Sequence, residues 1–143
     1  KFIITLFIAE FWFYHTHIVM HRIPIIYRGI HKLHHLYSRP FALSGMHTHP
    51  IEVLIGSIPS VAIGPRITGI YGIYLYVWMF ITGYNTAVSH SGLDFWPLID
   101  KFHDYHHKYN VYNLGSIGLF DMLYGTFKNP YPREMCNQSK HYQ

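Results

Sequence analysis

Histidine is the residue type with the clearest chemical pattern in this sequence of 143 residues, which contains 13 of them. Two segments share the pattern His-x-x-His-His, one beginning at His31 and the other at His103. On an α-helix, residues three and four positions apart lie side by side, so each segment can present three imidazoles on one face. Neutral imidazole is a good ligand for zinc, iron, copper and nickel. The two segments therefore predict a metal site made of histidine.

Further histidines increase the number of candidate ligands beyond what one ion needs. His17 and His21 have the i, i+4 spacing of paired ligands, and His90 ends a long segment without charge. A structural zinc ion takes four ligands, so nine imidazoles suggest two metal ions with four or five ligands each. Acidic residues are few, and Asp104 is the one inside a histidine box. The nine candidate metal ligands are His17, His21, His31, His34, His35, His90, His103, His106 and His107.

Three other histidines have weaker grounds for a role at this site. His47 and His49 alternate in a segment before Pro50 that we expect to be extended. His49 is a candidate tenth metal ligand. The alternative for His47 and His49 is that they contact the metal ligands or lipid headgroups without binding metal. His15 lies two residues before His17, about 200° around a helix, so we expect it to face away from the site.

Apolar segments must position these histidines. The chain is 50% hydrophobic and only 13% charged, which favours a membrane protein. Phe2–Met20 is predicted to be a helix, and Ile67–Val88 is the clearest transmembrane segment because it has no charge. Between them Ile51–Ile63 would span about 20 Å, short for a full crossing. Gly64-Pro65-Arg66 is expected to be the turn of a helical hairpin.

The charges and the single cysteine narrow the class of protein. One cysteine forms no internal disulfide, and the basic residues are too scattered for nucleic-acid binding. Most of the basic residues flank the histidine segments, which predicts that these face the cytosol. We expect an all-α integral membrane helical bundle with a cytosolic, histidine-rich helical cap over residues 1–127, and a polar, loosely ordered tail over 128–143. Because the chain opens at Lys1, we expect it to be truncated at its N-terminus.

The order of the histidine boxes and their flanks resembles the fatty acid hydroxylase/sterol desaturase superfamily. The resemblance covers roughly residues 10–126. The residues that carry it are Trp12-Phe13-Tyr14 before His17-x3-His21, then His31-Lys32-Leu33-His34-His35, Pro40-Phe41-Ala42, His49-Pro50, His90-Ser91-Gly92, Phe102-His103-Asp104-Tyr105-His106-His107, Asn113-Leu114-Gly115 and the stretch from Phe120 to Thr126.

This resemblance implies an integral membrane enzyme, in eukaryotes usually of the endoplasmic reticulum, with a histidine-bound di-iron centre on the cytosolic side. Such enzymes use dioxygen to hydroxylate or desaturate lipids and sterols, with electrons from NAD(P)H, often through cytochrome b5. The nine histidines match the family's ligand positions. We expect Asp104 and Asn113 to orient imidazoles by hydrogen bonds to their free ring nitrogens.

Several alternatives stay open at this point. The chain has Ile18 where family members often have Arg, and Thr86 where some carry another histidine. The flanks resemble both sterol C-5 desaturases and C-4 methylsterol oxidases, so a sterol-like substrate is their common feature, and hydroxylation and desaturation are not separated. Zinc accepts imidazole as readily as iron does. Two rival classes remain. One is a membrane zinc-binding or metal-transport protein without oxygenase activity, and the other is a degenerate member of the family that only binds other proteins.

Overall fold

The described part of the chain, residues 1–92 and 100–129 of a computed structural model, consists of helices and connecting loops with no strand. The expected all-α class is therefore confirmed. The elements are α1 (Phe2–Arg22), α2 (Pro24–Gly29), the 3₁₀ helices η1 (His31–Leu36) and η2 (Ala42–Met46), α3 (Pro50–Glu52), the π-helical segment η3 (Val53–Ser57), α4 (Ile58–Thr68), α5 (Ile73–Ser89), α6 (Asp100–Tyr109) and α7 (Leu119–Tyr124).

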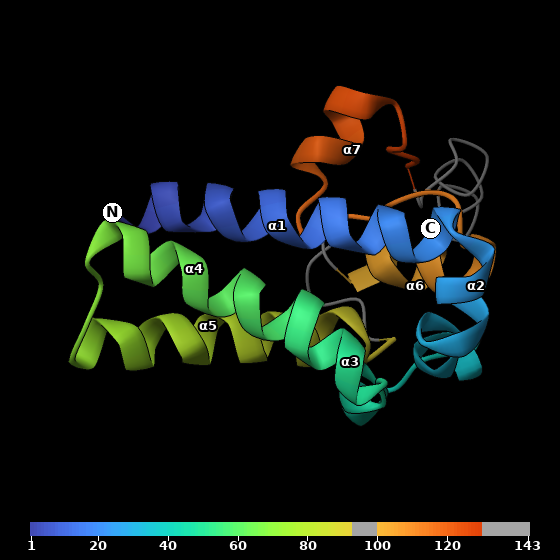
Figure 1. Ribbon diagram of the computed structural model, residues 1–143, viewed down its shortest axis with the longest axis horizontal. Helices are drawn as coiled ribbons and strands as arrows, with labels where there is room; N and C mark the ends of the chain where they lie inside the picture. The colour runs from blue at the N-terminus through green and yellow to red at the C-terminus, as the bar shows by residue number, and fades with distance from the viewer. Residues whose placement is uncertain (93–99, 130–143) are drawn as a thin grey trace, which may run out of the picture.

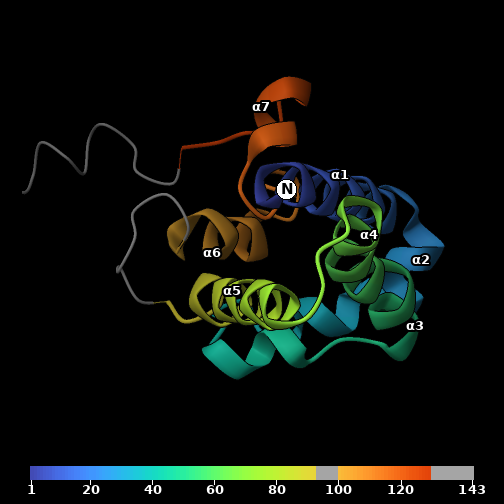
Figure 2. The same cartoon turned by 90° about the vertical axis from the view of Figure 1, so that its left-hand side faces the viewer.

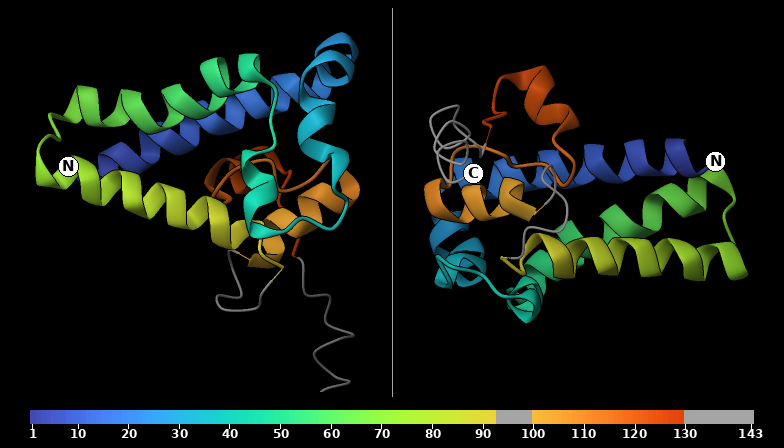
Figure 3. Two further views of the ribbon diagram at one scale, coloured as in Figure 1. Left: turned by 90° about the horizontal axis from the view of Figure 1, so that it is seen from below. Right: turned by 180° about the vertical axis from the view of Figure 1, so that it is seen from behind.

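Three long helical segments give the molecule two distinct ends. In Figure 1, α1 runs along the long axis, and α4 and α5 extend toward its N-terminal end, where the turn between them lies. The end-on view in Figure 2 separates α1, α4, α5 and α6, and α6 lies on the side away from α4. The two views in Figure 3 show that α2, η1 and α6 gather at the other end of α1. The histidine segments are therefore collected at one end of the molecule.

The first helix has the bounds that the sequence indicates. It ends at Arg22, and Pro24 opens α2 at its first position. Proline lacks the N–H that a continuing helix would need and is tolerated in a first turn. This break turns the chain so that α2 and then η1 lie at the C-terminal end of α1.

The expected hairpin turn at Gly64-Pro65-Arg66 is wrong. The helical stretch Pro50–Thr68 is 19 residues long and continues through Pro65. It ends instead at Gly69, whose φ of 63° is left-handed and suits glycine. As a result the second segment is longer than the predicted Ile51–Ile63, and α5 begins only at Ile73.

Two tryptophans explain why this helix tolerates its prolines. Pro65 has no N–H for the carbonyl of Val61 four residues earlier, and the indole N–H of Trp78 donates to that oxygen at 2.9 Å. Pro59 also lacks an N–H, and the carbonyl of Ile55, in the π-helical segment η3, accepts from the indole of Trp12 at 2.9 Å. Both carbonyls thus accept a hydrogen bond from a neighbouring helix. These bonds connect α1 to η3 and α5 to α4.

The long helices keep many large apolar side chains on their outer faces. Two helical stretches, Phe2–Arg22 and Pro50–Thr68, are long and apolar enough to cross a membrane. Ile3 is 85% exposed and Phe80 73%. An apolar surface of this kind marks a partner or a membrane. It supports membrane association.

Candidate metal centre

The structure brings all nine predicted metal ligands together, in two groups. Each group offers one ring nitrogen per histidine, and these atoms lie within 4.8 Å of one another. Each His-x-x-His-His box contributes to both groups, because residues four apart point to one side and the histidine between them to the other. The five-histidine group is His17, His21, His31, His35 and His106, and the four-histidine group is His34, His90, His103 and His107.

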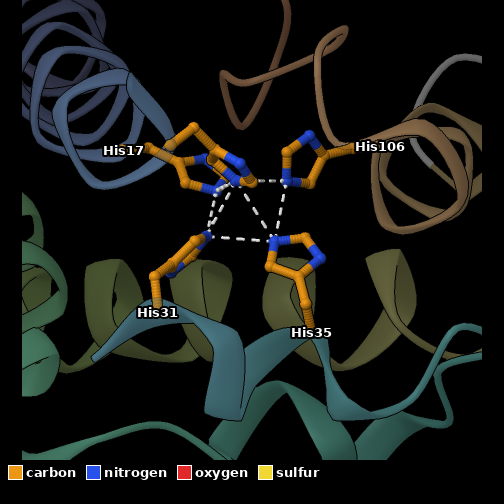
Figure 4. A group of neighbouring side chains, drawn as sticks. His17, His31, His35 and His106 are labelled. Atoms are coloured by element: carbon orange, nitrogen blue, oxygen red, sulfur yellow. Dashed lines mark hydrogen bonds between the residues drawn. The ribbon is translucent and has the colours of Figure 1, made fainter. Parts of the chain in front are cut away.

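The five-histidine group has all its Nε2 atoms turned toward one centre. The Nε2 of His31 lies 2.8 Å from that of His21 and 3.0 Å from those of His17 and His35. The Nε2 of His106 lies 3.1 Å from that of His21 and 3.2 Å from that of His35. Figure 4 shows the labelled rings of His17, His31, His35 and His106 pointing toward one another from α1, η1 and α6. Elements distant in the sequence therefore converge on one small volume.

The outer nitrogens of three of these rings have acceptors of their own. The Nδ1 of His17 lies 2.6 Å from the carbonyl of Leu114, and the Nδ1 of His106 lies 2.8 Å from that of Tyr112. The Nδ1 of His31 lies 2.9 Å from a carboxylate oxygen of Glu52. Because carbonyls only accept, the Nδ1 atoms of His17 and His106 must carry the ring proton and their Nε2 atoms a lone pair. An ionised Glu52 requires the same arrangement in His31.

Several lone pairs about 3 Å apart repel one another unless a cation lies between them. Two imidazoles at right angles around a metal ion at about 2.1 Å would have nitrogens about 3.0 Å apart. The observed separations of 2.8–3.2 Å agree with this spacing. The donor set and its spacing thus fit a metal ion.

The four-histidine group is looser. The Nε2 atoms of His34 and His90 are 3.4 Å apart, and the Nδ1 of His90 faces the carbonyl of Thr86 at 2.8 Å. The buried Nε2 of His103 has no hydrogen-bond partner among the described residues. A buried nitrogen without a partner is costly unless something binds it. This group therefore also fits a metal ion.

Burial keeps the imidazoles in the form that binds metal. Removal from water lowers the pKa of His107 to about 3, and lowers the pKa of His34 and His103 well below its usual range. The same cause lowers the pKa of His35 and His106, and neighbouring imidazoles add to it. A buried imidazolium is unfavourable, so these rings are neutral at pH 7 and can donate lone pairs.

Two buried carboxylates hold the loop that supports His17. The carboxylate of Asp121 accepts from the backbone N–H of Leu114 and of Gly115, each at 2.7 Å. One oxygen of Glu10 accepts from the N–H and the hydroxyl of Ser116 at 2.8 and 2.7 Å. A Cβ on Gly115 would collide with both carboxylates, so a larger residue there would displace them. The loop is thereby fixed with the Leu114 carbonyl against His17.

Sequence reasoning did not identify Glu10, Glu52 or Asp121 as functional. Glu10 and Glu52 each stand alone among apolar residues of a helix, and both are buried. An acidic residue inside an apolar helix is costly unless it has partners, and that signal could have found both. Asp121 had no such signal, because its backbone partners are defined only by the folded loop.

Asn113 has hydrogen bonds that differ from the expected ones. Its amide group donates to the carbonyls of Phe102 and Lys128, and its oxygen accepts from the N–H of Lys128. These bonds go to the backbone and none goes to an imidazole. Asn113 also has a φ of 55°, which asparagine tolerates better than most residues. It therefore stabilises the chain around α6 rather than an imidazole directly. Asp104 lies half-buried on α6, and its expected role stays a prediction.

The candidate tenth ligand lies outside both groups. His49 is the N-cap of α3, and its Nδ1 accepts from the N–H of Ile51 at 3.2 Å. The ring is turned to its own helix, which explains why it does not reach the other imidazoles. His47 contacts the carbonyl of Leu33, and His15 packs against Phe120, so both also lie apart from the two groups.

Fold and site together define an all-helical protein with a histidine-lined centre suited to two metal ions. Comparison with known proteins then gives the family. The model of the fatty acid hydroxylase family matches residues 2–126, and this chain belongs to that family. No solved structure matches the chain.

Curated relatives share about a third of their residues with the chain. It is 36% identical over 122 residues to human fatty acid hydroxylase domain-containing protein 2, covering 83% of this chain and 36% of that one. It is 32% identical over 134 residues to methylsterol monooxygenase 2-2 of Arabidopsis thaliana, covering 85% and 50%. It is 35% identical over 135 residues to a very-long-chain aldehyde decarbonylase of Oryza sativa subsp. indica, covering 85% and 50%. The chain thus spans half or less of the length of these relatives.

Proposed function

We propose that the protein is part of a dioxygen-dependent di-iron membrane oxidoreductase that hydroxylates or desaturates a lipid, with a sterol as the favoured substrate. The observation that carries the proposal is the convergence of nine imidazoles, seven of them buried, into groups of five and four. The relatives named as a hydroxylase-domain protein and a methylsterol monooxygenase support the lipid and sterol assignment.

The chain's residues would hold the two ions and keep the site dry. When bound, the iron ions would supply the activation of dioxygen, with two electrons, that oxidation of a C–H bond requires. The imidazoles bind through lone pairs that burial keeps unprotonated. Leu114, Tyr112 and Glu52 hold three ring protons at Nδ1, which fixes the tautomers and ring directions.

Asp104 is the remaining residue for which we propose an orienting role. It lies on α6 between His103 and His106, one from each histidine group. Replacing it with alanine should lower turnover while the protein keeps its fold. Full activity of Asp104→Ala would remove it from the proposal.

An apolar cavity offers a place for a lipid. It has a volume of about 710 Å³ and lies between α4 and α5, with Ile58, Val61, Leu75 and Met79 among its lining residues. Volumes of 300–1,000 Å³ are typical of small-molecule sites. The cavity begins at Ser57, five residues and about 7.5 Å along the helix from Glu52. A hydrocarbon body lying there would have its end near the histidines.

The charge distribution supports an electron donor at the histidine end. Arg22, Arg28, Lys32 and Lys108 are exposed on the elements that carry or adjoin the histidines. Positive charge beside a membrane helix favours the cytosolic side, and it would attract an acidic redox protein. Cytochrome b5, reduced from NAD(P)H, is the donor we propose, in the endoplasmic reticulum membrane with the centre facing the cytosol.

The test is turnover under ¹⁸O₂ with protein purified in detergent, loaded with iron and supplied with an electron donor. We expect a methylsterol or another sterol to gain one ¹⁸O atom, or to lose two hydrogen atoms if desaturation occurs. The His35→Ala variant, which removes one of the converging nitrogens, is the control and should be inactive. Absence of both products from sterol, fatty acyl and aldehyde substrates would refute the oxidoreductase assignment.

A further inference from the structure

The two histidine groups differ in how firmly their imidazoles are held before any ion binds. In the five-histidine group, the Nδ1 atoms of His17, His31 and His106 each face an acceptor at 2.6–2.9 Å. In the four-histidine group one ring, that of His90, has such an acceptor. The buried Nδ1 atoms of His34 and His107, and that of His35 in the five-histidine group, have no hydrogen-bond partner among the described residues. Rings already fixed in the binding orientation lose less freedom when a ligand arrives. The five-histidine group is thus the more preorganised one.

Charge adds to this difference through Glu52. Its carboxylate lies 2.9 Å from the Nδ1 of His31, and it is 5% exposed. A carboxylate on the outer nitrogen raises the basicity of the metal-binding nitrogen more than a neutral carbonyl does. In its ionised form the side chain also stabilises a cation on the far side of the ring in a site of low dielectric. His31 belongs to the five-histidine group, so that group gains most.

The free oxygen of Glu52 strengthens this interpretation. Its Oε2 is buried and has no hydrogen-bond partner among the described residues. An uncompensated buried carboxylate is unfavourable, and a nearby cation would reduce that cost. Position and charge together indicate that Glu52 is suited to a loaded site.

We propose that Glu52, acting through His31, makes the five-histidine group bind its metal ion before the four-histidine group and more tightly. This inference rests on the proposed binding of two metal ions, and it makes Glu52 a positioning residue rather than a ligand. The four-histidine group then fills second and exchanges its ion more readily.

The experiment is a titration of metal-free protein with Co²⁺ in competition with a chromophoric chelator, followed by bound metal and by the visible absorption of Co²⁺. The unaltered protein should bind two equivalents in two steps. In Glu52→Gln, which keeps the shape and removes the charge, the tight step should weaken about 10–100-fold and the second step should stay the same. His90→Ala is the matched variant, because it should abolish the weak step and preserve the tight one.

A second pair of outcomes keeps the test decisive if Glu52→Gln folds poorly. His35→Ala should then remove the tight step, since His35 belongs to the five-histidine group, and His90→Ala should remove the weak one. Two equal steps, or a Glu52→Gln variant that weakens both steps alike, would overturn the proposal while leaving two bound ions. Binding of no metal ion at all would overturn this inference and the proposed metal centre together.

Discussion

The two ends of the molecule are stabilised in different ways, although the same long helices run through both. At the histidine end the buried side chains are largely polar, and Glu10, His17, His106, Asn113 and Asp121 are all at most 1% exposed. At the opposite end large apolar side chains of α1 and α5 face outward. The structure of the histidine end therefore depends on hydrogen bonds within the protein, whereas that of the apolar end depends on the apolar medium or partner that covers its outer face.

Loop structure explains the need for carboxylates at the histidine end. The loop between α6 and α7 is not helical at residues 114–117, so their backbone N–H groups need acceptors from elsewhere. Asp121 and Glu10 accept from four of them, on residues 114–117. Buried backbone donors without acceptors are costly, so these two side chains replace the missing helix bonds.

The largest effect should come from Asp121→Asn. The amide nitrogen of asparagine cannot accept, so at least one backbone N–H, of Leu114 or Gly115, would lose its acceptor in a buried site. We expect the free energy of unfolding to fall by about 3 kcal/mol or more. We also expect weaker metal binding, because the Leu114 carbonyl would no longer be held against His17. Thermal unfolding and metal content measure the two effects.

Met122→Ala provides the control on the same helix, since Met122 is 60% exposed. It should change the free energy of unfolding by less than about 0.5 kcal/mol. Equal stability of Asp121→Asn and Met122→Ala would contradict the role given to the carboxylate.

A smaller effect is expected from Trp78→Phe at the apolar end. The variant removes the indole donor from the Val61 carbonyl, whose helix partner is missing because of Pro65. We expect a loss of about 1–3 kcal/mol in the free energy of unfolding and no change in metal content. Differential scanning calorimetry in detergent and metal analysis would check both.

The double variant Pro65→Ala/Trp78→Phe isolates the cause of that loss. Alanine restores the backbone N–H that the Val61 carbonyl lacks, so the double variant should recover about 1 kcal/mol relative to Trp78→Phe. If Pro65→Ala brings no recovery, the loss comes from packing of the indole and not from its hydrogen bond.

The smallest effect is expected from Phe80→Ala, on the exposed face of α5. Phe80 is 73% exposed and belongs to the apolar part of the molecule. Within detergent the change in the free energy of unfolding should be below about 0.5 kcal/mol, because few protein contacts are lost. A melting temperature lowered as much as in Trp78→Phe would mean that this face is packed against protein.

Much of the site could be predicted from the sequence because imidazole spacing on helices is a local property. His17 and His21 follow the i, i+4 rule, and the helix that carries them ends where Arg22 and Pro24 indicated. The expectation that each box presents three imidazoles on one face is wrong, because the histidines of both boxes divide between the two groups. The box at His31 also forms a 3₁₀ helix instead of an α-helix.

What the sequence could not provide depends on contacts between distant segments. The turn was expected at Pro65 because a proline usually ends a helix, and the Trp78 indole that satisfies Val61 comes from another helix. His49 was a candidate ligand because of its place before Pro50 at the start of a helix, but the direction of its ring is decided by the cap of α3. Glu52 reaches His31 only because α3 folds back onto η1, a tertiary fact that spacing does not contain.

Metal content is the measurement that tests the central claim most directly. The protein, purified without oxygen and analysed by mass spectrometry, should contain near two iron ions per chain. The double variant His34→Ala/His106→Ala, which removes one ligand from each group, should lose most of this metal and keep its helical content. Iron that survives the double substitution, or an unaltered protein that holds only zinc, would contradict a histidine-bound di-iron centre.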